Sequence, residues 1–240
     1  IRKRVGALAR VLDWHIRRTT PKDKQPAANP LRLMPVGYST YSRLDEGQLT
    51  TGAKVKRDQA RDRRLAPGDE ARVRAALSGE KRDDRERPWG NDPEFTLLFD
   101  LILDTGLRLS EAYRLRTDQL DFEMGVIRVE GSKGHRGALK PRVVPLKPGL
   151  RKKLEAWCQG RTGLLFSFWD GTPVGRKRAS AKLSIRFATL FAYAQVNDFT
   201  EHDLRHEATC RWVELRKRGH WVFSEIEVCR IMGWTDTRMM

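Results

Sequence analysis

Two arginines, a histidine and a tryptophan stand in three short segments whose spacing suits anion chemistry. Arg108 follows a Thr-Gly-Leu turn and precedes Ser110, a residue type that often caps a helix. A helix N-terminus that begins there would add backbone N–H groups that favour an anion. His202 and Arg205 are three residues apart, so a helix would put imidazole and guanidinium on one face. Trp234 follows a glycine at the end of an apolar segment. Any one segment alone is also explained by ordinary surface ion pairs.

The charge of the chain indicates a polyanionic partner. Its 240 residues include 47 Lys and Arg against 31 Asp and Glu, a formal net charge of +16. Residues 1–38 and 174–190 are strongly basic, and the second stretch contains no acidic residue. Its candidate phosphate-binding residues are Arg176, Lys177, Arg178 and Lys182. Cations that neutralise phosphates release condensed counterions, so nucleic acid is the expected partner, with a solvated basic surface as the alternative.

Other classes of protein fit the sequence poorly. The longest apolar stretch, residues 95–103, contains Asp100 and is far shorter than the about 20 residues of a membrane span. Cys158, Cys210 and Cys229 form no CxxC pair and cannot all pair within one chain, which favours a reducing, cytosolic setting. The chain begins with Ile1 and a basic segment, so we expect no signal peptide and a natural N-terminus that lies further upstream.

The hydrophobic periodicity predicts a mainly helical fold with one small antiparallel β-sheet, an α+β arrangement. The expected helices cover residues 1–18, 67–77, 92–103, 110–115, 150–157, 181–194, 203–215 and 225–232. Asp92 and Gly106 are the expected start and stop signals of the third helix. Alternating apolar residues predict strands at 126–129 and 142–146, joined by a glycine-rich connection.

Together, the three segments resemble the active-site boxes of the tyrosine recombinase (phage integrase) family. The chain has the TGxRxSE motif at 105–111, HxxR at 202–205, and Trp234 where most members have His and some have Trp. The resemblance covers residues 64–240. It implies that residues 65–240 form the family's catalytic domain, with its C-terminus incomplete. Residues 39–64 would be a linker, and residues 1–38 the C-terminal part of a helical core-binding domain.

The resemblance also implies roles for single residues. Arg108 and Arg205 would bind the non-bridging phosphate oxygens, and Glu111 would support the site from behind. His202 would exchange a proton with the attacking phenol, and Trp234 would offer its indole N–H to a phosphate oxygen.

A lysine on the β-hairpin of the family would protonate the leaving 5′-oxygen. Lys133, in the sequence Gly-Ser-Lys-Gly, fits this place best. Lys140, across the same connection, is the competing candidate and also a candidate for binding DNA phosphate. The connection is longer than the shortest hairpins of the family.

The implied reaction is site-specific cleavage and rejoining of DNA strands through a 3′-phosphotyrosyl intermediate, without cofactor or metal. The family's nucleophilic tyrosine follows the His/Trp position by more residues than remain after Trp234. The tyrosines in the chain are Tyr38, Tyr41, Tyr113 and Tyr193, and none has that sequence context. We therefore expect the nucleophile beyond Met240, and expect the 240 residues alone to bind and position DNA without cleaving it.

The resemblance further implies double-stranded DNA as partner, a homo-tetramer in the synaptic complex and a cytoplasmic, nucleoid-associated protein with no membrane attachment. The fragment alone is expected to be monomeric. Two functional alternatives stay open at this point: a catalytically inactive DNA-binding relative, and a type IB topoisomerase-like enzyme with a similar set of residues. A zinc site is a third alternative, since His202, His206 and Cys210 have helical spacing.

Overall fold

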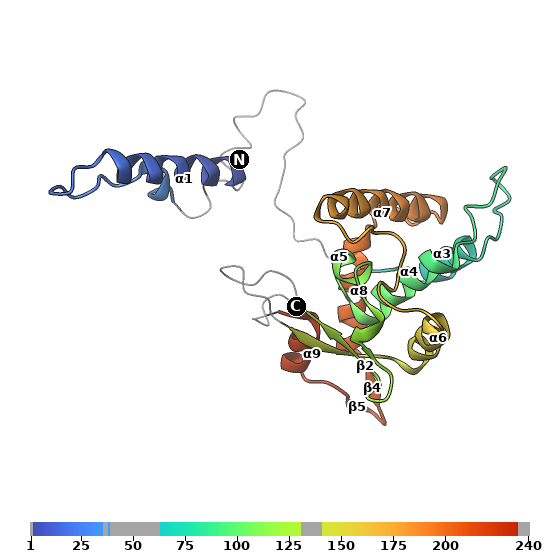
Figure 1. Cartoon of the computed structure of the whole chain (residues 1–240). Helices are drawn as coiled ribbons and strands as arrows, with labels where there is room; N and C mark the ends of the chain where they lie inside the picture. Colours follow the sequence, from blue (N-terminus) through green and yellow to red (C-terminus); the bar gives the residue numbers. More distant parts are fainter. Residues whose placement is uncertain (1, 36–37, 39–62, 131–140, 235–240) are drawn as a thin grey trace. The chain divides into compact units, whose positions relative to one another are not determined.

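The computed structural model describes residues 2–35, 38, 63–130 and 141–234. The chain divides into two compact units, Ile1–Arg61 and Asp62–Met240, which are described separately (Figure 1). Among the helices of the described ranges, none combines the length and the apolar character needed to cross a lipid bilayer.

The first unit contains the helix α1 (Arg2–Thr19) and the short 3₁₀ helix η1 (Pro30–Arg32), as the sequence predicts for α1. Asn29 caps η1 through its side-chain oxygen, and its Nδ2 donates a hydrogen bond of 2.6 Å to Asp13 on α1. Arg32 forms an ion pair of 2.7 Å with the same carboxylate. Asp13 therefore fastens the returning segment to the helix.

The apolar positions of α1 are not all buried. Leu8, Val11 and Trp14 are exposed. Helical spacing identifies an apolar stripe without showing what covers it.

The second unit is mainly helical and contains a small antiparallel sheet, as predicted. Its helices are α3 (Asp69–Leu77), α4 (Pro93–Thr105), α5 (Leu109–Ala112), η2 (Thr117–Gln119), α6 (Pro148–Cys158), α7 (Pro173–Tyr193), α8 (Glu201–Val213) and α9 (Glu225–Met232). Its strands are β1 (Leu120–Asp121), β2 (Val126–Val129), β3 (Arg142–Pro145), β4 (Arg216–Lys217) and β5 (His220–Trp221). The first three form one sheet in the order β1-β2-β3, and the last two pair separately.

Helix α4 forms the centre of the second unit. Its residues are almost all buried, and it packs against α8, α6 and α5. In Figure 1, α4 and α8 run through the middle of the unit, α7 lies across one end, and α9 lies with the strands at the other. Asp92 caps α4 with hydrogen bonds from two backbone N–H groups, and Gly106 ends it with a φ of 67°. Both boundary signals were predicted, and they fix the point where the chain turns toward Arg108.

The register of the sheet determines which side chains of β3 point inward. Val129 pairs with Arg142, and Ile127 pairs with Val144. Ile127 and Val144 are fully buried, whereas Val143 is half exposed. Because side chains alternate along a strand, Arg142 lies on the same face as Val144, toward α9.

Most helix starts differ from the predictions, by up to eight residues, and the caps of two of them give the reason. Helix α7 begins at Pro173, because the hydroxyl of Thr172 accepts a hydrogen bond from the N–H of Gly175 and proline suits the first position. Helix α5 begins at Leu109 with Arg108 at its N-cap, so Ser110 is not the cap. The two-residue strand β1 is too short to show alternation and was missed.

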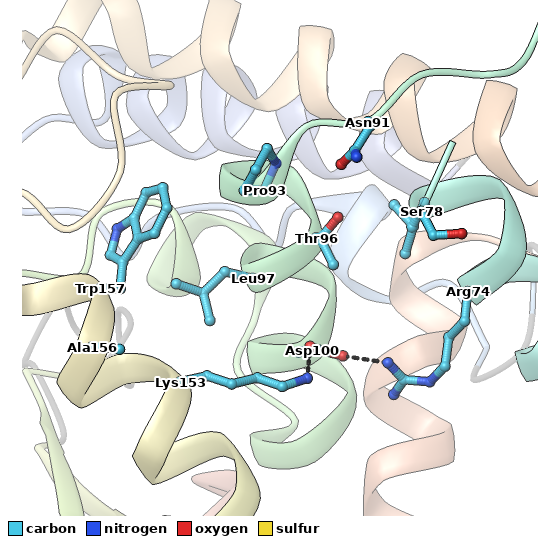
Figure 2. Close-up of a pocket in the computed structure, with 11 residues that line it drawn as sticks. Arg74, Ser78, Asn91, Pro93, Thr96, Leu97, Asp100, Lys153, Ala156 and Trp157 are labelled. Atoms are coloured by element: carbon cyan, nitrogen blue, oxygen red, sulfur yellow. Dashed lines mark hydrogen bonds and ion pairs between the residues drawn. The ribbon is translucent and has the colours of Figure 1, made fainter. Parts of the chain in front are cut away.

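A buried carboxylate joins three helices on another side of α4. Asp100 accepts hydrogen bonds from Arg74 on α3, at 2.8 Å, and Lys153 on α6, at 2.6 Å (Figure 2). Beside it is a pocket of about 610 Å³ whose lining includes Leu97 and Trp157. None of the described site residues predicted from the sequence lines this pocket, so it is separate from the predicted chemistry.

Candidate active site

Arg108 and Glu111 are held together at the start of α5. One carboxylate oxygen of Glu111 accepts a hydrogen bond of 3.0 Å from the backbone N–H of Arg108, and the other accepts one of 3.0 Å from its Nη1. The side chain of Glu111 is 5% exposed and that of Arg108 is 34% exposed. Glu111 thus supports Arg108 from the interior, while the side chain of Arg108 stays partly exposed.

Arg205 reaches the same place from α8. It is buried, and its guanidinium donates hydrogen bonds to the backbone carbonyls of Gly106 and Met232. The first carbonyl lies just before Arg108 and the second at the end of α9. Its Cζ lies 5.6 Å from the ring centroid of Trp234, which is partly buried. Arg205 therefore connects three chain segments that are far apart in the sequence.

A third arginine, Arg142, completes the cluster and was not predicted as a site residue. Its Nη1 and Nη2 contact the two oxygens of Glu111 at 3.1 and 2.7 Å, and its Nε donates to the carbonyl of Ile231 at 2.9 Å. Its side chain is 6% exposed. The alternation of β3 could have identified Arg142 as a buried residue. Val144 points inward, and Arg142, two residues before it, lies on the same face of the strand.

The cluster of Arg108, Arg142, Arg205 and Glu111 has three cations and one anion. Burial raises the pKa of Glu111, but the hydrogen bonds and charges of Arg142 and Arg108 outweigh this effect and lower it to about 2. Burial, together with repulsion from Arg108 and Arg142, lowers the pKa of Arg205 to about 9. Glu111 and Arg205 are therefore both charged at neutral pH. With three cations around one anion, the cluster favours an anion with several oxygens, such as phosphate.

His202 lies in the first turn of α8 and its side chain is exposed. Thr200 caps this helix, and Asp203 accepts hydrogen bonds from the backbone N–H and the hydroxyl of Thr200, at 2.7 and 2.8 Å. The rigid start of α8 puts His202 one turn before Arg205, on neighbouring positions of the helix surface.

The family model described as "Phage integrase family" matches residues 92–240, which include all of this cluster. The chain belongs to the phage integrase family. It is 30% identical over 188 residues to the shufflon-specific DNA recombinase of Escherichia coli, an alignment that covers 78% of this chain and 41% of that protein. It is 29% identical over 187 residues to tyrosine recombinase XerC of Stutzerimonas stutzeri, covering 74% of this chain and 56% of that one. The chain thus spans about half the length of these two relatives.

Solved structures of other proteins share the fold of this chain. One is the XerH site-specific recombinase bound to difH substrate, with a TM-score of 0.60 and 17% identity over 97% of this chain and 58% of that one. Another is the XerA recombinase, with a TM-score of 0.53 and 17% identity over 78% of this chain and 60% of that one. The mainly helical tyrosine recombinase fold expected from the sequence is confirmed.

The two lysine candidates of this integrase-family chain, Lys133 and Lys140, lie outside the described residues. The strands that flank them are described, and the pair Val129–Arg142 is the last one before the connection. Arg142, the partner of Glu111, belongs to this pair.

The basic residues of α7 lie apart from the arginine cluster. Arg176, Lys177, Arg178 and Lys182 are all exposed, in the first part of the helix. The link to the cluster runs through Tyr113, whose hydroxyl donates to the carbonyl of Arg176 at 3.1 Å and lies 3.0 Å from the hydroxyl of Ser180. Tyr113 directly follows α5, so α5 and the basic surface of α7 are mechanically connected.

The zinc alternative obtains no additional ligands from the fold. Cys210 Sγ lies 3.9 Å from His206 Nε2 on α8. Within the described ranges, no group of three or more His, Cys, Asp or Glu side chains is arranged to hold a metal ion.

Proposed function

We propose that this protein is a site-specific DNA recombinase that cleaves and rejoins DNA strands through a 3′-phosphotyrosyl link. The observation that carries the proposal is the arginine cluster: Arg108 and Arg142 both pair with Glu111, and Arg205 lies close enough to be repelled by both arginines, all within the region matched by the family model. The two relatives described above are a shufflon-specific DNA recombinase and a tyrosine recombinase, and they support the same reaction.

In the proposed reaction, Arg108 and Arg205 bind the non-bridging oxygens of the scissile phosphate. Negative charge increases on these oxygens in the pentacoordinate transition state, and preorganised cations stabilise it without the help of a metal ion. The partial exposure of Arg108 supports direct contact with DNA. Trp234, beside Arg205, would donate its indole N–H to the same phosphate.

Proton transfers would involve His202 and a lysine. The exposed imidazole of His202 is available to exchange a proton with the attacking tyrosine. Lys133, or alternatively Lys140, would protonate the leaving 5′-oxygen. The nucleophile would be a tyrosine outside the 240 residues. Tyr113 is unsuited to this role because it is fully buried and hydrogen-bonded to α7.

We also propose the domain roles implied by the family: residues 1–38 as part of a core-binding domain, 39–64 as linker and 65–240 as catalytic domain. The division of the chain into two compact units supports a boundary near residue 62. Double-stranded DNA would be the partner, bound by a homo-tetramer in the synapse, in the cytoplasm and at the nucleoid. A structural neighbour that is bound to DNA, the XerH recombinase with its difH substrate, supports the choice of partner.

The test of the reaction is covalent capture. The complete natural gene product is incubated with a nicked duplex that carries the recombination site from the flanks of its own genetic element, and protein–DNA adducts that survive detergent are counted. We expect an adduct with the wild type, and a loss of at least about 100-fold for Arg108→Ala and Arg205→Lys. Arg74→Lys is the matched control, since Arg74 pairs with a buried carboxylate away from the cluster. Binding without any adduct would indicate the inactive relative instead.

DNA binding by the α7 surface has its own test. Lys177→Gln removes one exposed cation, so the slope of log Kd against log salt for a duplex is expected to fall by about 1. Lys152→Gln, at an exposed position of α6 outside the α7 surface, is a control for simple loss of net charge. An unchanged slope for Lys177→Gln would remove this residue from the interface.

A further inference from the structure

We infer that Arg142 is a positioning residue for the phosphate-binding site: it holds Glu111, and through Glu111 it orients Arg108. The inference rests on the proposed function. It assigns to Arg142 a task separate from that of Arg108 and Arg205, because it acts on the carboxylate that supports the site and not on the DNA.

The guanidinium of Arg142 has two partners, the carboxylate of Glu111 and the backbone carbonyl of Ile231. Two of its nitrogens contact the two oxygens of Glu111, and its third nitrogen donates to the carbonyl of Ile231. Both members of the ion pair are about 95% buried, so solvent competes little with this geometry. A planar guanidinium can make the three contacts at once, whereas the single ammonium of lysine cannot.

These contacts bring together the segments that carry the proposed chemistry. Arg142 is the first residue of β3 and directly follows the connection that contains Lys133 and Lys140. Glu111 belongs to α5, next to Arg108. Ile231 lies at the end of α9, just before Trp234, and a Cβ atom on Gly233 would lie 3.1 Å from Arg142 Cδ. One side chain of β3 thus contacts both α5 and the end of α9.

Burial separates the role of Arg142 from that of Arg108. The side chain of Arg142 is 6% exposed, and that of Arg108 is 34% exposed. Glu111 Oε1 accepts from both arginines, at 3.1 and 3.0 Å. If Arg142 is lost, the carboxylate keeps Arg108 as partner but can rotate with it, so the guanidinium that faces the DNA loses its fixed direction. Misplacement of a catalytic group by about 1 Å can lower a rate about 100-fold.

The experiment compares Arg142→Lys with Arg74→Lys in the complete natural protein. Arg74 also binds a buried carboxylate, that of Asp100, but outside the arginine cluster. Single-turnover cleavage of the nicked duplex, the Kd for the same DNA and the melting temperature are measured for each variant. We expect Arg142→Lys to lower the cleavage rate constant by about 10- to 100-fold while the Kd changes by less than about threefold. Arg74→Lys is expected to leave the cleavage rate constant unchanged at a similar melting temperature.

A double-mutant cycle with Glu111→Gln tests the route of the effect. If Arg142 acts through Glu111, the double variant should cleave no more slowly than the slower single variant. Additive losses would overturn the inference, as would wild-type cleavage by Arg142→Lys, or a parallel loss of DNA affinity that indicates direct contact with phosphate. Equal losses for both lysine variants would reduce Arg142 to a stabilising residue. Absence of cleavage by the wild type refutes the proposed function, and the inference with it.

Discussion

Replacement of Glu111 by Gln is expected to remove a pH-dependent part of the folding stability. The carboxylate is buried between Arg108 and Arg142 and is the one anion of the four-residue cluster. Glutamine has nearly the same shape as the protonated acid but carries no charge. The variant therefore measures what the negative charge contributes, with little change in packing.

The magnitude follows from the pKa. The pKa of Glu111 falls from 4.5 to about 2 on folding, and one pKa unit corresponds to about 1.4 kcal/mol, so the ionised carboxylate stabilises the fold by roughly 3 kcal/mol. Because the folded pKa is the lower one, this stabilisation is fully present above about pH 5. It is lost as the pH falls from about 4.5 toward 2, and about half of it is gone near pH 3.5.

The assay is urea unfolding of the wild type and the variant, at pH 7 and at steps down to pH 3.5. We expect Glu111→Gln to be less stable by roughly 3 kcal/mol at pH 7, with a gap that narrows by about 1.5 kcal/mol at pH 3.5. Glu155→Gln is the control, because this carboxylate forms an exposed pair with Arg151 whose contribution is below about 1 kcal/mol. A gap of less than 1 kcal/mol at pH 7, or one that stays constant with pH, would refute the charge-based account of the cluster.

Two further stability predictions concern the scaffold of the site. Gly106→Ala is expected to cost about 2–5 kcal/mol in urea unfolding, because φ is 67° and the new Cβ would lie 2.7 Å from the sulfur of buried Met232. Gly160→Ala, at a φ of 69° in open space, should cost only the backbone part, so equal losses would contradict the packing argument. Tyr113→Phe is expected to cost about 1 kcal/mol through its lost hydrogen bonds to α7, and a change within error would show that this link is not stabilising.

The local signals in the sequence predicted most of the fold. Asp92, Pro93 and Gly106 mark the ends of α4 because capping depends on residues within one turn of the helix end. The alternation in β2 and β3 likewise gave both strands and their pairing, since it reflects burial on one face. The confirmed helix ends and strands are features that depend on residues close together in the sequence.

The site was only partly predictable, for the opposite reason. Arg108, Glu111, Arg205 and Trp234 were selected through the family resemblance, and the structure brings these four together. The contacts that hold them are long-range: Arg205 binds backbone carbonyls of two other segments, and nothing in its local sequence identifies them. The sequence predicted Arg142 only as part of a strand, because its partner Glu111 is 31 residues away in the chain.

Differences in burial among the cations explain why only a few of them form the candidate site. Among the described residues, most Lys and Arg side chains are exposed or half-buried, and hydrated cations attract a polyanion without distinguishing one phosphate from the next. Arg205 differs because burial and two neighbouring arginines depress its pKa, so its charge is retained at a free-energy cost within the fold. In the proposed reaction, a bound phosphate would relieve that cost, and would relieve it most when extra negative charge forms on its oxygens. Burial of Arg205 would then favour the transition state over the ground state.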